Sequence, residues 1–183
     1  MSDPSSRASA LDTQVRNEWA PELRALFDGT ELAAKAGFTA SLVTVDAEGC
    51  PHTSLLSAGE LYAPDSHALL FLLWPTARAA RALREQAAQG RARATLAFVY
   101  DAAFFQVRLT VDALPDDGEL ACFDASIETV QAQRVAYAKL TSGIAFELEA
   151  PSSDAVLSRW GRQIDRLRLA AQARRPASST SGD

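Results

Sequence analysis

The chain has 183 residues, 48% of them hydrophobic, and a formal net charge of −5 at pH 7. This length suits a single domain with one core, and the negative charge argues against a general electrostatic grip on nucleic acid or on an anionic membrane. The two cysteines form no CxxC pattern and no stretch approaches the roughly 18 apolar residues of a membrane span, so we expect a soluble, cytoplasmic protein.

Both ends of the chain are predicted to be flexible tails, because residues 1–12 and 175–183 contain too few apolar side chains to become ordered. Residues 13–174 are then expected to form one domain. An amphipathic helix is predicted between Thr13 and Ala36, ended or bent near Gly29. Its apolar residues recur at intervals of three and four: Val15, Trp19, Leu23, Leu26 and Phe27.

A hairpin and a fully apolar strand are predicted next. The segment "FTASLVTV" (38–45) is rich in β-branched and aromatic residues, and "PHTSLLSAGELY" (51–62) is its partner. Between them "DAEG" is typical of a tight turn, in which Gly49 can adopt a positive φ angle. The segment "HALLFLLW" (67–74) is apolar throughout, which predicts a strand buried on both faces. Its second face needs something to cover it.

The remaining segments alternate between helix and strand. A helix is predicted from Thr76 to about Gln89, followed by the strands "RARATLAFVY" (91–100) and "AFFQVRLTVDAL" (103–114). In the second strand Gln106 and Arg108 point away from the apolar face. A helical stretch from about Glu119 to Leu140 and a last strand, "GIAFELEA" (143–150), follow.

A C-terminal helix is predicted around Trp160, and the segment from Arg159 to Arg175 holds six arginines against one aspartate. Long basic side chains lying over apolar surface explain this composition. With six strands and several helices, the predicted fold is mainly β with flanking helices (α+β), a small antiparallel barrel with helices packed outside.

Several familiar sites are not supported by the sequence. With only His52 and His67 and no HExxH motif, a metal site lacks ligands. The GxGxxG, GxxxxGK[ST] and GxSxG motifs are absent. Cys50 and His52, two residues apart, could form an activated thiolate pair, although a half-buried cysteine beside a surface histidine is the commoner arrangement. No side chain stands out as a general acid or base.

The start of the helix at Thr76 has an unusual charge. The first turn of a helix normally favours Asp or Glu, because free N–H groups and partial positive charge are found there. Here the helix carries Arg78, Arg81 and Arg84. With Thr76 as N-cap, a dianionic phosphate would be held by the free N–H groups and Arg78 together. An ordinary solvated face of three arginines is the alternative.

These segments together resemble the FMN-binding split-barrel family, also called pyridoxamine 5′-phosphate oxidase-like. The likeness runs from about Gly37 to Leu114 and consists of "TVDAEGCPHTSLLS", "FLLWPTARAARAL" and "FFQVRLTV" in this order. The resemblance implies a split barrel of six strands that binds FMN. It also implies a homodimer with flavin between the subunits, which would cover the second face of "HALLFLLW".

The resemblance implies a set of cofactor-binding residues. The backbone of one segment would run along the flavin ring: His52, Thr53, Ser54, Leu55, Leu56 and Ser57. Leu72 and Leu73 would lie beside the ring and Gln106 would touch it. Arg78 would bind the phosphate, with Thr76 and Arg81 in support.

Three departures from the family pattern bear on the substrate. Ala79 and Ser57 stand where relatives carry lysine, and "IDRLRLAA" (164–171) lacks the proline of the oxidase's C-terminal ending. Pyridoxine metabolism is therefore not expected.

The expected function is an oxidoreductase that passes electrons between a reduced nicotinamide, or another donor, and an unknown small molecule. A flavin- or heme-binding barrel without turnover and a structural dimer without cofactor are the alternatives.

Overall fold

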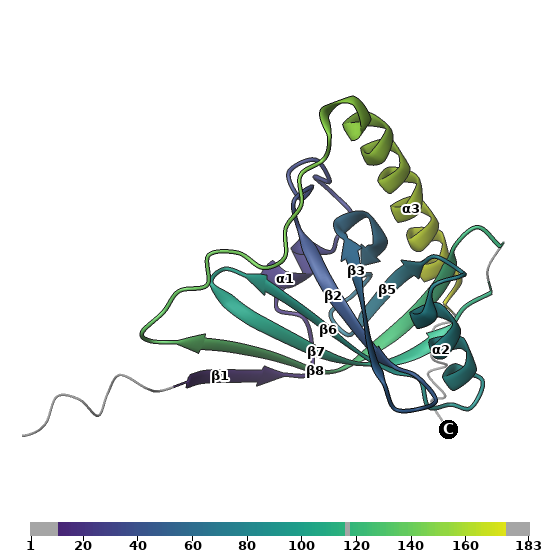
Figure 1. Cartoon of the computed structure of the whole chain (residues 1–183), viewed down its shortest axis with the longest axis horizontal. Helices are drawn as coiled ribbons and strands as arrows, with labels where there is room; N and C mark the ends of the chain where they lie inside the picture. The colour runs from purple at the N-terminus through teal and green to yellow at the C-terminus, as the bar shows by residue number, and fades with distance from the viewer. Residues whose placement is uncertain (1–10, 116–117, 175–183) are drawn as a thin grey trace, which may run out of the picture.

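The structure, a computed structural model, describes residues 11–115 and 118–174, so the predicted tails lie outside the described residues except at residues 11 and 12. Figure 1 shows a bent antiparallel sheet with helices packed outside it. The strands are β1 (Leu11–Arg16), β2 (Thr39–Val45), β3 (Pro51–Ser57), β4 (Leu61–Tyr62), β5 (Ala68–Leu73), β6 (Arg93–Tyr100), β7 (Ala103–Ala113) and β8 (Ala121–Val135). The helices are α1 (Pro21–Leu26), α2 (Arg78–Ala87) and α3 (Ser153–Ala173), with short 3-10 turns η2 (Ala58–Glu60) and η3 (Ala150–Ser152).

The sheet forms a barrel that stays open on one side. Its strands follow the order β3-β2-β6-β7-β8-β5-β4, and β1 pairs with the far end of β8. Within the described part of the chain, the terminal strands β3 and β4 do not pair with each other, and η2 links them across the opening. The mainly β class with flanking helices is confirmed, whereas the described residues form eight strands rather than six.

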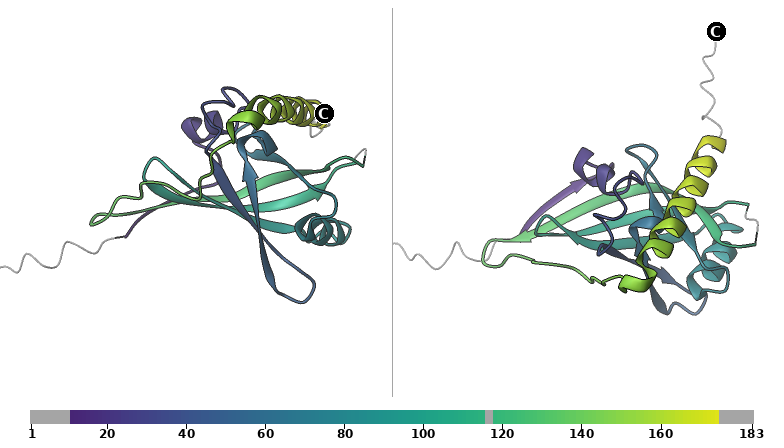
Figure 2. Two further views of the ribbon diagram at one scale, coloured as in Figure 1. Left: turned by 45° about the horizontal axis from the view of Figure 1, so that its top comes forward. Right: turned by 90° about the horizontal axis from the view of Figure 1, so that it is seen from above.

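The predicted hairpin is confirmed in detail. β2 pairs with β3 in register from Thr39 opposite Ser57 to Val45 opposite Pro51. The turn is closed by Asp46, whose Oδ1 accepts hydrogen bonds from the backbone N–H groups of Glu48 and Cys50, and Gly49 has φ +83°. A side chain there would be strained, so the glycine fits the turn. Figure 2 shows α2 beside this hairpin and α3 along another flank of the barrel.

β5 is buried on both faces, as predicted, but the cover of its second face comes from the chain itself. Leu69, Phe71 and Leu73 point into the barrel core. Leu70 and Leu72, both fully buried, pack with Ile164 and Leu167 of α3. The expectation that a flavin or a partner subunit would cover this face is wrong, because the C-terminal helix already removes it from water.

α3 is attached to the opening of the barrel by Trp160, which is 3% exposed. Its indole packs directly on Gly59 in η2, where an added Cβ atom would overlap the indole. The ring of Phe146 meets it edge-on at 6.2 Å. The C-terminal helix predicted from the sequence is confirmed as a basic amphipathic helix. Within the described ranges, no helix is long and apolar enough to cross a membrane.

The helix predicted over Glu119–Leu140 is wrong, because most of this segment is the 15-residue strand β8. Its alanines, glutamates and glutamines favour helix locally, and an irregularity of register at Leu109, opposite Ile127, interrupts the alternation of buried and exposed residues. Pairing with β7, β5 and β1 overrides these local preferences.

Two further predicted elements are corrected. The single helix over Thr13–Ala36 is instead β1 followed by the short α1, with Val15 on an exposed strand. The strand predicted over 143–150 is an irregular strap that touches the sheet through one isolated bridge, between Ala145 and Phe38. β1 was missed because its pairing partner β8 is more than a hundred residues away in the sequence.

The end of α3 is held over β8 by an ion pair. The Arg174 Nε lies 2.8 Å from Oδ2 of Asp124, and Asp65 approaches Arg174 from the solvent side at 3.8 Å. The other oxygen of Asp124 is buried without a hydrogen-bond partner among the described residues. Burial raises the pKa of Asp124 above its ordinary value, and nearby Asp112 and Asp65 raise the pKa further, while Arg174 opposes them.

At pH 7 the free energy of unfolding of Asp124→Asn is therefore expected to equal that of the parent or to exceed it by up to about 1 kcal/mol. Because the folded-state pKa is raised, the contribution of Asp124 to stability is full below the unfolded pKa of 3.8 and is lost as pH rises through the folded pKa. The advantage of the variant should shrink as pH falls from 7 toward 4. Urea unfolding across this range measures it, with Asp12→Asn on the exposed strand β1 as control; a pH-independent difference would contradict the expectation.

Candidate functional site

The start of α2 presents two arginines that form no direct ion pair with the described residues. α2 begins at Arg78 with Ala77 as N-cap, so the expectation that Thr76 caps the helix is wrong. Thr76 lies in a turn closed by the hydrogen bond from the Ala77 N–H to the Trp74 carbonyl. The first turn has no acidic residue and no side-chain cap. The side chains of Arg78 and Arg81 are exposed, and neither forms an ion pair or hydrogen bond with the described residues.

A shallow cavity of about 240 Å³ separates these arginines from the β2–β3 turn, and the carboxylates of Asp46, Glu48 and Glu85 line it as well. On its far side His52 Nε2 lies 2.8 Å from Asp46 Oδ2. This hydrogen bond, followed by that from the Cys50 N–H, lowers the pKa of Asp46. The structure therefore pairs His52 with Asp46, whereas Cys50 lies exposed in the turn before β3. A Cys50–His52 thiolate pair has no support in this geometry.

β3 is an edge strand, and its side chains alternate between the two faces of the sheet. His52, Ser54 and Leu56 lie on the interior side, opposite the buried Thr44, Leu42 and Ala40 of β2. Thr53 and Leu55 lie on the outer face, and Leu55 is 54% exposed. Ser57 is buried, where its N–H and hydroxyl both donate to Glu60 Oε2. Only β2 pairs with β3 among the described strands, so the other edge of its backbone is available.

The side chains of Leu72 and Leu73 are not placed where they could contact a flavin. Leu72 lies under α3 and Leu73 lies in the barrel core. Their backbone is more open, because β4 pairs with β5 only at Phe71 and Leu70. Contact of these two residues with a ligand is therefore limited to main-chain atoms.

Gln106 lies on the outer face of the sheet, in a row that includes Leu55. Gln106 is opposite Ala97 of β6, Ala97 is opposite Ser41 of β2, and Ser41 is opposite Leu55 of β3. Three strand spacings correspond to about 14 Å. One subunit thus does not bring Gln106 to the edge of its own β3.

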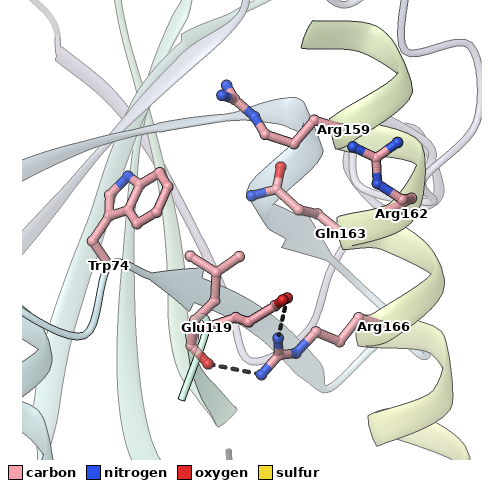
Figure 3. A pocket seen from close by; sticks show the side chains of 7 residues that line it. Trp74, Glu119, Arg159, Arg162, Gln163 and Arg166 are labelled. Carbon is pink, nitrogen blue, oxygen red and sulfur yellow. Dashed lines mark hydrogen bonds and ion pairs between the residues drawn. The ribbon is translucent and has the colours of Figure 1, made fainter. Parts of the chain in front are cut away.

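A second group of polar residues, which the sequence did not reveal, lines two neighbouring cavities along α3. The first, of about 360 Å³, lies between the end of β3, the strap and Trp160. The second, of about 490 Å³, lies between α3, Trp74 and the start of β8, and Figure 3 shows its side chains. Arg159 lines both. Each contains a buried oxygen without a partner among the described residues, Thr39 Oγ1 in the first and Gln163 Oε1 in the second.

The described residues hold no group of three or more His, Cys, Asp or Glu side chains that could bind a metal ion. His67 is exposed and lies 3.5 Å from Glu18. The edge of β3 and the start of α2 offer main-chain groups and the guanidinium groups of Arg78 and Arg81 to a ligand, beside the carboxylates of the same cavity. The N–H and guanidinium donors suit an anionic group of an organic molecule.

Comparison with known proteins places the chain in a family. No family model matches the sequence. A Bacillus subtilis protein, the uncharacterized YclD, is 32% identical over 148 residues, which are 78% of this chain and 91% of YclD. The chain belongs to the YclD family. This relationship extends over nearly the whole described barrel and brings no known activity, since YclD itself is uncharacterized.

This YclD-family chain is also similar to several solved structures. A candidate pyridoxamine 5′-phosphate oxidase from Lactobacillus delbrueckii is 20% identical, with a TM-score of 0.46 over 63% of this chain and 94% of that one. The heme storage protein HutZ from Vibrio cholerae is 16% identical, with a TM-score of 0.41 over 59% and 89%. The name of the first of these structures agrees with the resemblance found in the motifs, and neither ligand nor activity follows from this similarity.

Proposed function

We propose that the protein binds FMN between the free edge of β3 and the start of α2 and acts as an oxidoreductase on a small organic molecule. The observation that carries the proposal is the start of α2, where Arg78 and Arg81 have no ion-pair or hydrogen-bond partner among the described residues and no acid lies in the first turn. Three carboxylates line the same cavity, so the phosphate has to be held by Arg78, Arg81 and the free N–H groups against their charge. Free N–H groups and two guanidinium groups together match a dianionic phosphate.

The neighbouring backbone fits the rest of such a cofactor. The free edge of β3 offers main-chain N–H and C=O groups of alternate residues between His52 and Leu56, and an edge strand readily pairs with a ligand that has donors and acceptors in a row. When bound, the flavin would supply hydride and electron transfer. The chain's own residues would anchor the phosphate, orient the ring and keep water from its face.

A homodimer would be needed for Gln106 to touch the proposed cofactor. Because Gln106 lies about 14 Å from the edge of β3 in its own chain, contact with a cofactor at that edge requires a second copy. The outer face of the sheet would form the interface, and it already exposes apolar residues such as Leu55. Sedimentation of the protein should therefore give a dimer.

A heme-binding barrel without turnover is the second candidate, favoured by the fold shared with HutZ. Its axial ligand would have to come from one of the two histidines. His67 lies on the exposed surface, and His52 has Nε2 hydrogen-bonded to Asp46, which leaves Nδ1 for a ligand role.

Titration of the ligand-free protein with FMN, riboflavin and hemin is expected to separate these functions. FMN should bind saturably and about 10-fold or more tightly than riboflavin, since only FMN has the phosphate that Arg78 and the free N–H groups would hold. Flavin fluorescence and absorbance measure the binding, and oxidation of reduced nicotinamide by the FMN-loaded protein then tests turnover. Equal affinities for FMN and riboflavin would contradict the proposed phosphate site. Binding of hemin but of neither flavin would favour the heme-binding barrel instead.

A further inference from the structure

The cavity between α3 and Trp74 has the features of a built binding site. Gln163 is 7% exposed, and its Oε1 is buried without a hydrogen-bond partner in the described structure. Figure 3 shows its amide extending from α3 into the cavity toward Trp74. A buried acceptor left unpaired costs about 1–3 kcal/mol, and a ligand donor that reaches Oε1 would remove this cost.

The charge of the lining selects an anion. Three arginines and one glutamate line the cavity. Arg166 is engaged, because its Nη2 donates to the Leu120 carbonyl at 2.9 Å and its Nη1 lies 3.9 Å from Glu119. The guanidinium of Arg162 donates to the uncharged Ser158 hydroxyl. Arg159 has neither an ion pair nor a side-chain hydrogen bond within the described ranges. Two positive charges therefore stand without a described acidic partner.

Trp74 determines the shape of the ligand. Its indole is 58% exposed and forms the wall opposite α3, as Figure 3 shows. An exposed indole face stacks with a flat ring, at a gain of about 0.5–1.5 kcal/mol beyond burial. Leu120 adds an apolar contact on the same lining. A volume of about 490 Å³ is enough for one small ring with its substituents.

We propose that this cavity binds a small planar organic anion, with its ring on Trp74, its anionic group on Arg159 and Arg162, and a hydroxyl or N–H donor on Gln163 Oε1. Arg159 also lines the cavity at the end of β3, so the anion lies next to the edge assigned to the flavin ring. Its role as the substrate of the flavin rests on the proposed function. The binding itself does not.

Calorimetric titration of the ligand-free full chain tests the site with two probes. Salicylate carries a carboxylate and a hydroxyl donor on a ring, and phenyl phosphate carries the phosphate alternative. At least one should bind, and benzyl alcohol, which is neutral, should not. The tighter probe identifies carboxylate or phosphate as the preferred group. Failure of both, or equal binding of benzyl alcohol, would overturn the site.

Four variants locate the binding. Arg159→Ala is expected to weaken the better probe about 10-fold or more, the usual size of a lost charge-assisted contact. Gln163→Leu should weaken salicylate while leaving the urea midpoint unchanged or higher, because it removes a buried unsatisfied acceptor; a purely structural glutamine would lower that midpoint. The exposed Arg24→Ala controls for net charge, and Arg78→Ala controls for binding at α2. Unchanged affinity in both Arg159→Ala and Gln163→Leu, or equal losses in Arg24→Ala or Arg78→Ala, would overturn the assignment.

Adding the better probe to FMN-loaded protein tests adjacency. A shift of the flavin absorbance bands, abolished by Arg159→Ala, is expected. If the probe binds but the flavin spectrum does not shift, the anion site stands, and the anion is not the substrate of the flavin. If FMN does not bind at all, the titrations of the ligand-free chain still decide whether the anion site exists.

Discussion

Replacing Trp160 by alanine is expected to lower the free energy of unfolding by about 3–5 kcal/mol, the usual cost of removing a buried indole. Trp160 is 3% exposed and joins α3 to η2 across the opening of the barrel. Without it, the helix keeps its contacts through Ile164 and Leu167 but loses its anchor near Gly59. Urea unfolding followed by circular dichroism measures the loss, and hydrogen exchange should show α3 opening before the barrel.

The neighbouring Gly161 supplies the matched control. A Cβ atom at Gly161 meets nothing within 4 Å, and α3 continues through this position. Gly161→Ala should therefore raise the stability by about 0.5–1 kcal/mol through helix propensity alone. If the free energy of unfolding of Trp160→Ala stayed within about 1 kcal/mol of that of the parent, α3 would not be held by this contact. The two cavities along α3 would then not be fixed features of the fold.

Features that depend on neighbouring residues could be predicted from the sequence. The β2–β3 hairpin is encoded by alternation, by a turn of Asp46 to Gly49 and by Pro51 at the start of the second strand. The run of apolar residues in β5 correctly predicted burial on both faces. It could not reveal the cover, because α3 begins eighty residues later and an apolar face looks the same under a helix as under a partner subunit.

Features that depend on distant pairing were missed. β8 is built from residues that favour helix, such as Ala125 and Glu128, and becomes a strand because the strands on both sides of it supply its hydrogen bonds. β1 has the apolar spacing of a helix but pairs with the end of β8. In both cases the energy that decides the structure comes from partners far away in the sequence, which local periodicity does not report.

The candidate site shows the same division. Arg78 and Arg81 could be singled out because cations at a helix start oppose the helix dipole, an anomaly visible within a few residues. The cavity of Trp74 and Gln163 could not, because its walls come from β5 and α3 and a glutamine in an amphipathic helix is unremarkable until its burial is known. The six arginines near the C-terminus were explained as a cover for apolar surface, and the structure adds that Arg159 faces a cavity.

Arg78→Ala is expected to weaken FMN binding about 10- to 100-fold, because a charge-assisted contact to a phosphate contributes about 1.5–3 kcal/mol. Riboflavin, which lacks the phosphate, should bind the variant and the parent equally well. The fold should be unaffected, since the Arg78 side chain is exposed and has no partner among the described residues. Titration by flavin fluorescence measures both affinities, and urea unfolding confirms equal stability.

Two further variants separate charge from geometry at the start of α2. Arg78→Lys should recover part of the FMN affinity, because lysine restores the charge but not the two parallel hydrogen bonds of a guanidinium group. Arg81→Ala should have a smaller effect than Arg78→Ala, because Arg81 lies one turn further from the free N–H groups. A loss of riboflavin affinity equal to that of FMN would show that Arg78 acts on the ring or the fold. If Arg78→Ala retained full FMN affinity, the Arg78 guanidinium group would not contact the phosphate, and the proposed phosphate site would have to be abandoned.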